Sequence, residues 1–248
     1  MTLAWLLMGL GCVAGLYATV GHAGASGYIA VFALAGYEGS AIRPIALVLN
    51  VLVASLATLH FHRAGHLRPG LLPPLLLASI PAAALGGAIA LPNRALQPLL
   101  GIILLLSAVR LCWNPALDRP LRGVPPIAVV SVTGAGLGFM AGLTGTGGGI
   151  FLTPWMILRG WLSPRQAGAI SAVFILVNSL SGLAGLLVRQ GPELLPSPAS
   201  LVPMALVVMV CGAFGAWCGS HAIPPRWIRR LLALVLLVAS VKLLAVRF

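Results

Sequence analysis

Residues 123–158, with the sequence GVPPIAVVSVTGAGLGFMAGLTGTGGGIFLTPWMIL, contain no Asp, Glu, Lys or Arg. One crossing of a bilayer needs about 20 apolar residues, so this run is too long for a single straight helix. Five glycines stand within Gly142–Gly149, and each costs about 1 kcal/mol relative to Ala inside a helix. We therefore predict two helical segments, Ala128–Leu143 and Ile150–Leu158, joined by an unwound Gly-rich turn.

The rest of the chain is equally apolar. Hydrophobic residues make up 60% of the 248 residues, charged residues only 7%, and the mean hydropathy is +1.06. About a quarter of the residues of a soluble domain are charged. We therefore predict an all-α polytopic integral membrane protein, because helices satisfy their own backbone groups in lipid. Further charge-free runs cover residues 1–37, 69–93, 166–188 and 194–225.

The chain divides into two similar halves. Gly11–Leu16 (GCVAGL) matches Gly138–Leu143 (GFMAGL) at an offset of 127, and Asn50 matches Asn178 at an offset of 128. We predict two homologous repeats, 1–123 and 124–248, each with a broken or re-entrant opening helix and three further transmembrane helices. The other predicted segments are Thr2–Val20, Tyr28–Tyr37, Ala41–Leu59, Leu71–Ala90, Ala95–Leu111, Gln166–Leu187, Ser200–Cys218 and Ile228–Val246.

The distribution of basic residues predicts the topology. If each opening segment turns back, 10 basic residues fall on one side of the membrane and 5 on the other, whereas a single crossing divides them 8 to 7. The positive-inside rule favours the asymmetric division. We therefore predict inverted repeats in a bacterial inner membrane, with both termini in the periplasm.

The two Gly-rich turns are candidates for an anion site. Unwound backbone at membrane depth persists only where protein or a water-filled cavity satisfies it. Its N–H groups and the positive end of the following helix favour an anion. The candidate residues are Gly24 and Ser26 in the first turn, and Thr146, Gly147, Gly148 and Gly149 in the second.

Buried polar residues on the predicted helices add to this site. Asn50 and Asn178 stand among Leu and Val, where an unpaired amide costs several kcal/mol. They either tie helices together or line one central pocket. Ser171 lies seven residues before Asn178, on the same helical face. Arg43 occupies the equivalent place before Asn50, either as a positive charge for an anion or as a headgroup anchor.

Several classes of function are excluded or disfavoured. The net charge of +12 comes from scattered basic residues without the basic face that nucleic acid requires. The four cysteines show no ligand spacing, so we expect no metal and no cofactor. There is no Walker motif for ATP-driven transport.

With these turns and the paired Asn residues, the chain resembles the sulfite exporter TauE/SafE family of anion permeases. The likeness is carried by the Gly142–Gly149 turn, Pro154 and Asn178–Gly182 (NSLSG). His22–Tyr28 departs from the Gly-Gly-Gly turn that the family often repeats. The resemblance implies export of sulfite or small organosulfonates. The partners implied are that small anion and membrane lipid, and a homodimer is left open.

We predict that the anion is exported by alternating access and that the membrane potential drives the export. A permease or channel for another small anion is the main alternative. Gly24–Gly27 (GASG) also resembles the serine motif of rhomboid intramembrane proteases, with His22 or His221 as the base. The second half has no matching Ser, so we expect no enzyme and no catalytic residue. Because the predicted spans contain no acidic residue, we also expect no coupling ion.

Overall fold

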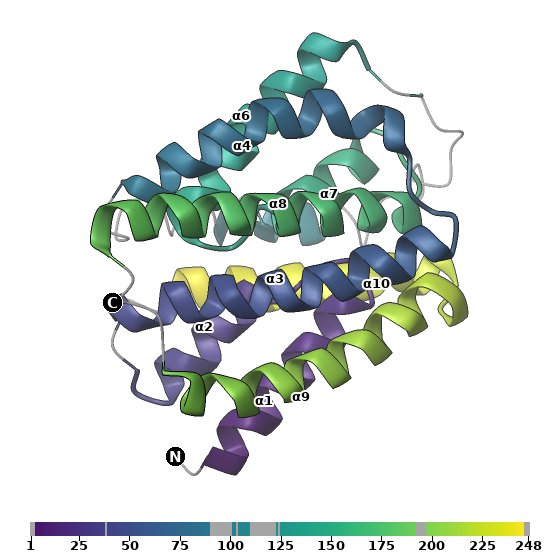
Figure 1. Ribbon diagram of the computed structural model, residues 1–248. Coiled ribbons are helices and arrows are strands. Elements are labelled where there is room, and N and C mark those ends of the chain that lie inside the picture. The colour runs from purple at the N-terminus through teal and green to yellow at the C-terminus, as the bar shows by residue number, and fades with distance from the viewer. Residues whose placement is uncertain are drawn as a thin grey trace.

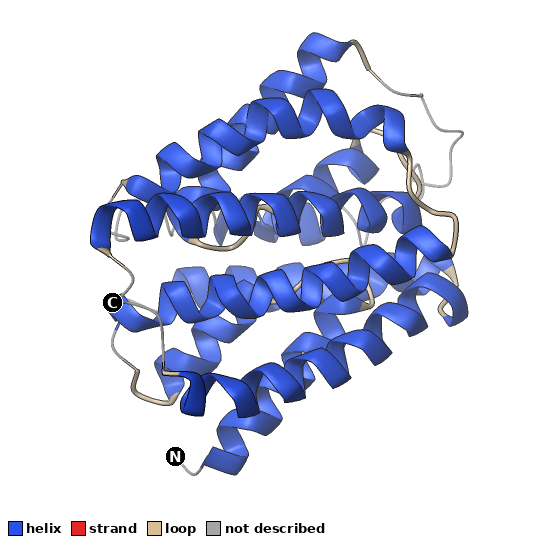
Figure 2. Cartoon of the chain, in the orientation of Figure 1, coloured by secondary structure: helices blue, strands red, loops and turns tan. Residues whose placement is uncertain are grey.

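The computed structural model describes residues 3–37, 39–89, 101–102, 104–109, 123, 125–191 and 197–245. Within these residues all regular secondary structure is helical (Figure 2), which confirms the predicted all-α class. The described part of the chain is therefore a multi-pass membrane bundle. Five helical stretches are long and apolar enough to cross a membrane: Ala41–Arg63, Pro69–Ala88, Ile127–Thr144, Pro164–Arg189 and Pro198–Ala222.

Both long opening segments are broken, as the glycines predict. In the first half α1 (Leu3–Ala18) is followed by the ten-residue α2 (Ala25–Leu34). In the second half α6 (Ile127–Thr144) is followed by the ten-residue α7 (Gly149–Leu158). At 1.5 Å per residue, ten residues span about 15 Å, half of the hydrocarbon core. Neither α2 nor α7 can cross the membrane alone.

The remaining α-helices are longer and agree with the predicted segments to within a few residues at each end. Pro at the first helical position favours the starts of α8 and α9, since it has no N–H to leave unpaired. Predicted segment Ala95–Leu111 lies mainly outside the described residues, although 101–102 and 104–109 are helical. The elements are α3 (Gly39–Arg63), η1 (Pro69–Leu71), α4 (Leu72–Ala88), α8 (Pro164–Gln190), α9 (Pro198–Trp217), the π-helical turn η4 (Cys218–Ala222) and α10 (Pro225–Ala245).

The two halves of the chain interlock. Helices α3 and α8 lie side by side at the centre of the bundle and run in opposite directions (Figure 1). Helix α4 packs on α6 and α8, and α9 packs on α1 and α3. The main contacts of each half are thus made with the other half.

Glycines permit the closest of these contacts. Gly134, Gly138 and Gly142 of α6 face the backbone of α4, and Gly215 of α9 faces Gly15 of α1. The small-residue spacing in the sequence predicts such packing. In α6, a Cβ on Gly138 would lie 2.6 Å from the Ser79 carbonyl oxygen, whereas Gly136 has open space around it.

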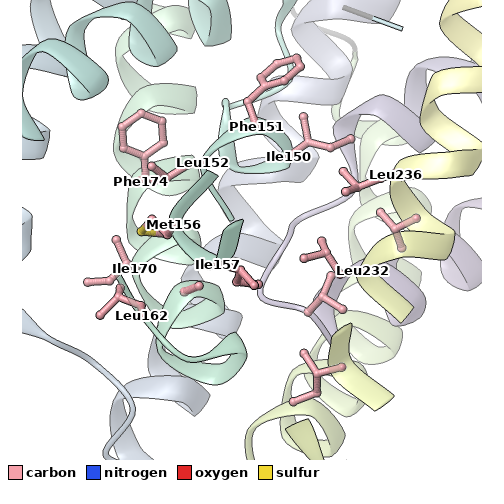
Figure 3. Packing of buried hydrophobic residues seen from close by; sticks show 14 of the residues in the cluster. Ile150, Phe151, Leu152, Met156, Ile157, Leu162, Ile170, Phe174, Leu232 and Leu236 are labelled. Carbon is pink, nitrogen blue, oxygen red and sulfur yellow. The ribbon is translucent and has the colours of Figure 1, made fainter. Parts of the chain in front are cut away.

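The short helix α7 is buried inside the protein. Its side chains pack between α8 and α10 (Figure 3). They belong to the same buried cluster as Phe174 of α8 and Leu232 of α10. The α7 members of this cluster include Leu152, Met156 and Ile157. This packing accounts for the apolar character of α7 on nearly every side. It also fixes the start of α7 deep in the bundle.

Arginines gather at one end of the bundle. This end, on the right in Figure 1, holds the end of α3, η1, the α7–α8 connection and the start of α10. The opposite end holds Arg43, Arg189 and Lys242 among the described residues. The arginines at the first end are Arg63, Arg68, Arg159, Arg165, Arg226, Arg229 and Arg230.

Candidate functional site

The starts of α2 and α7 are set by two glycines with left-handed backbone. Gly24 precedes α2 with φ 104°, and Gly148 precedes α7 with φ 77°. Residues with a Cβ rarely adopt such angles. Each glycine therefore lets the chain turn sharply after the preceding helix and start a new one at mid-depth.

The two turns meet at one small buried cavity. Its volume is about 10 Å³, which is room for roughly one water molecule. The first turn and its neighbours contribute Tyr17, His22, Ala23, Gly24, Ala25 and Ser26, and the second half contributes Thr146, Ile150 and Ile175. The cavity thus brings together three of the predicted site residues, Gly24, Ser26 and Thr146.

Asn50 of α3 connects the two turns beside this cavity. Its Oδ1 accepts a hydrogen bond from the Ala25 N–H, 3.0 Å away, at the first residue of α2. Its Nδ2 donates to the Thr146 carbonyl oxygen (3.4 Å) and to Ser179 Oγ of α8 (3.3 Å). Asn50 is fully buried. It therefore satisfies the helix start in one half and the turn in the other.

A second connection runs through His22. The Thr153 hydroxyl donates to Ser171 Oγ at 2.6 Å, and His22 Nε2 lies 2.7 Å from Thr153 Oγ1. A hydroxyl has one proton to donate, so Thr153 must accept from His22. The hydrogen-bond network therefore assigns the ring proton to Nε2. Nδ1 is buried without a hydrogen-bond partner, close to the Gly149 backbone.

Hydroxyl groups of Tyr17 and Ser26 line part of the cavity, and the Tyr28 hydroxyl holds the backbone of the first turn. Ser26 Oγ donates to Tyr17 Oη at 3.1 Å, and Tyr28 Oη donates to the Ala23 carbonyl oxygen at 2.6 Å. These groups leave the cavity polar and neutral. Among the residues that line it there is no Asp, Glu, Lys or Arg.

Asn178 does not mirror the contacts of Asn50. Its Nδ2 donates to the Phe174 carbonyl oxygen on the same helix at 2.8 Å, and its Oδ1 is buried without a hydrogen-bond partner. The expected equivalent of the Ala25 contact would be the backbone at Gly149, where α7 starts. The two amides predicted as a symmetric pair therefore occupy different environments.

Arg43 is not among the residues that line the cavity. Its guanidinium donates to the carbonyl oxygens of Gly142, Gly86 and Gly87. These carbonyls stand at the C-terminal ends of α6 and α4, where a cation is favoured by the helix dipole. The contact ties α3 to both helices just before the second turn.

The remaining predicted site residues stand around the second turn. A Cβ on Gly147 would meet Asn50 Nδ2 at 3.0 Å, and a Cβ on Gly149 would meet the Ile175 side chain. Ser171 accepts a hydrogen bond from Thr153, which contacts His22 in the first turn. The sequence did not indicate Tyr17 or Thr153 as site residues, because a hydroxyl in an apolar helix carries no sign of its distant partner. The sequence indicated His22 as a candidate base for the protease alternative and did not indicate its contact with Thr153.

Comparisons with known proteins agree with the resemblance found in the sequence. The family model described as sulfite exporter TauE/SafE matches residues 7–243. The chain belongs to this family. It is also 38% identical over 234 residues to "Probable membrane transporter protein y4hK" of Sinorhizobium fredii (strain NBRC 101917 / NGR234), covering 92% of each chain. No solved structure matches the chain. This TauE/SafE protein is accordingly a membrane transporter, built around the two turns described above.

The geometry also bears on the serine-protease alternative. Ser26 donates to Tyr17, and His22 Nε2 is occupied by Thr153. His221 lies in η4 and bonds to Ser220 at 2.8 Å. A catalytic serine needs an imidazole to accept its proton. The hydrogen bonds described above for Ser26, His22 and His221 are made with Tyr17, Thr153 and Ser220 and do not join Ser26 to either imidazole.

Proposed function

We propose that this TauE/SafE protein exports sulfite or small organosulfonates by alternating access, driven by the membrane potential. The observation that carries the proposal is the meeting of two Gly-rich turns at one buried polar cavity. The starts of α2 and α7 point positive helix ends toward it. Hydroxyls and amides around it can donate to an oxyanion without a carboxylate to repel it. The name of the family supports sulfite as the first anion to test.

Two inverted repeats supply the moving parts in this proposal. The antiparallel course of α3 and α8 and the reciprocal packing of α4 and α9 are what duplicated halves of opposite orientation produce. In such transporters the site lies where the repeats meet. The observed cavity is too small for sulfite, so the anion enters only when the turns move apart.

The unequal Asn residues fit an alternating mechanism. In the observed arrangement Asn50 binds the start of α2, while Asn178 Oδ1 has no partner. We propose that the pairing is exchanged in the other state, where Asn178 accepts from the start of α7. Inverted repeats can adopt two states by exchanging their conformations, so an asymmetry in one state is expected to be reversed in the other.

The membrane potential is sufficient as a driving force. An interior-negative membrane drives an anion outward by about 2.3 kcal/mol per charge per 100 mV. Since 1.4 kcal/mol is a factor of ten, a potential of about 100 mV sustains a concentration gradient of roughly fiftyfold for a monovalent anion. We propose that the arginine-rich end of the bundle faces the cytoplasm and that both termini face the periplasm of a bacterial inner membrane.

Reconstitution tests this function. Purified protein in liposomes is loaded with sulfite, a small organosulfonate or sulfate, and efflux is followed at imposed potentials with equal pH on both sides. We expect sulfite or the sulfonate to leave faster as the interior becomes more negative. If the protein is instead a permease or channel for another anion, that anion should leave the liposomes faster than sulfite or the sulfonate. Absence of any anion flux would contradict the proposal.

A further inference from the structure

The cavity lacks a fixed positive charge at the place where an anion is proposed to bind. Arg43 is engaged with carbonyl oxygens at the ends of α4 and α6. The polar groups that line the cavity are hydroxyls, backbone and one imidazole, that of His22. Among the lining residues, His22 is therefore the group that can gain a positive charge. Burial disfavours the charged ring while the site is empty, so protonation has to accompany the binding of an anion.

The hydrogen bonds of His22 determine which nitrogen is available. Nε2–H is committed to Thr153, whose own proton goes to Ser171. Nδ1 then carries a lone pair and has no hydrogen-bond partner, although the residue is only 2% exposed. An unpaired buried acceptor is unfavourable. Protonation at Nδ1 converts it into a charged donor close to the Gly149 backbone.

The neighbours of His22 favour an anion as its partner. Tyr17 of α1 is the nearest titratable ring, at 6.4 Å between centroids, and Tyr28 of α2 is bonded to Ala23. Thr153 of α7, Ser171 of α8 and Asn50 of α3 are neutral. No carboxylate is among these groups in the described part of the chain. A bound anion beside the ring therefore has no internal competitor for the imidazolium, and it favours the charged form.

We propose that His22 supplies the positive charge of the anion site: the ring binds the anion as imidazolium, with Nε2–H held by Thr153 and Nδ1–H donated to the ligand. This inference rests on the proposed function, because it concerns the same site. Its consequence is that anion affinity rises as the pH falls. A binding event that requires one proton changes the apparent KM by up to about tenfold per pH unit.

Methanesulfonate is the appropriate probe, because its charge does not change between about pH 5 and pH 8. Its voltage-driven flux is measured in proteoliposomes with the same pH on both sides, so that no proton gradient exists. For the wild type we expect KM to fall as the pH is lowered. His22→Gln should retain flux with a weaker and pH-independent KM. The matched control His66→Gln, in the loop after α3, should keep the wild-type pH profile.

The outcomes separate this inference from the function on which it rests. A wild-type KM that does not change with pH overturns the role of His22, even if His22→Gln fails to fold. So does a His22→Gln protein that keeps the wild-type pH dependence. Voltage-driven flux that is present but independent of pH leaves the transporter proposal intact. Absence of methanesulfonate and sulfite flux at every pH contradicts the function itself.

Discussion

Replacement of Asn50 and Asn178 by alanine provides a matched pair of perturbations. Both side chains are buried and equal in size, so the loss of volume is similar in the two variants. Asn50→Ala leaves the Ala25 N–H without its acceptor and removes two longer bonds to Thr146 and Ser179. An unsatisfied buried donor costs about 1–3 kcal/mol. Asn178→Ala removes one bond within its own helix together with an oxygen that has no partner.

We therefore expect Asn50→Ala to be less stable than Asn178→Ala by about 1–3 kcal/mol. In a chain of this size each kcal/mol of lost stability lowers the midpoint of thermal unfolding by roughly 2–4 °C. The assay is thermal unfolding of both purified variants in the same detergent, followed by flux in proteoliposomes. Asn178→Ala should fold like the wild type yet transport about tenfold more slowly, the effect of one lost hydrogen bond. Equal destabilisation of the two variants would refute the asymmetry on which this reasoning depends.

Three other predictions address packing, charge and topology. Gly138→Ala should destabilise the protein by about 1–3 kcal/mol through overpacking against Ser79, whereas Gly136→Ala, on the open side of α6, should be neutral or stabilising; unfolding of the two variants in parallel checks this. Arg43→Met should cost about 1.5–3 kcal/mol, since a charged donor to the ends of α4 and α6 is lost, and Arg43→Lys should recover part of it; recovery of full stability by Met would show that the contact is unimportant. A reporter fused at the C-terminus should report a periplasmic location, and a cytoplasmic signal would reverse the proposed orientation.

The helices were predictable because their signals are local. Charge-free runs and the glycines before α2 and α7 fix where helices start and stop, and these effects act within a few residues. The repeat also indicated Asn50 as a candidate for the site, although not that it contacts the second turn. The sequence therefore predicted the elements and three residues of the cavity.

The contacts that complete the cavity were beyond local reasoning. His22 and Thr153 are separated by 131 residues, and neither carries a mark of the other. The difference between Asn50 and Asn178 is a property of one conformation, whereas the sequence shows only their equivalence. Arg43 and Ser171 are likewise equivalent in the repeat, yet one binds helix ends and the other ends a hydrogen-bond chain.

The most direct test of the account asks whether the transported anion passes the cavity where the two turns meet. Thr146 lines that cavity and is partly accessible, so Thr146→Cys is made in a background where Cys12, Cys112, Cys211 and Cys218 are replaced by alanine. Voltage-driven methanesulfonate and sulfite flux is measured before and after reaction with a negatively charged thiol reagent. The account predicts that modification stops the flux and that saturating methanesulfonate slows the modification. A fully modified protein that transports at its original rate would contradict it.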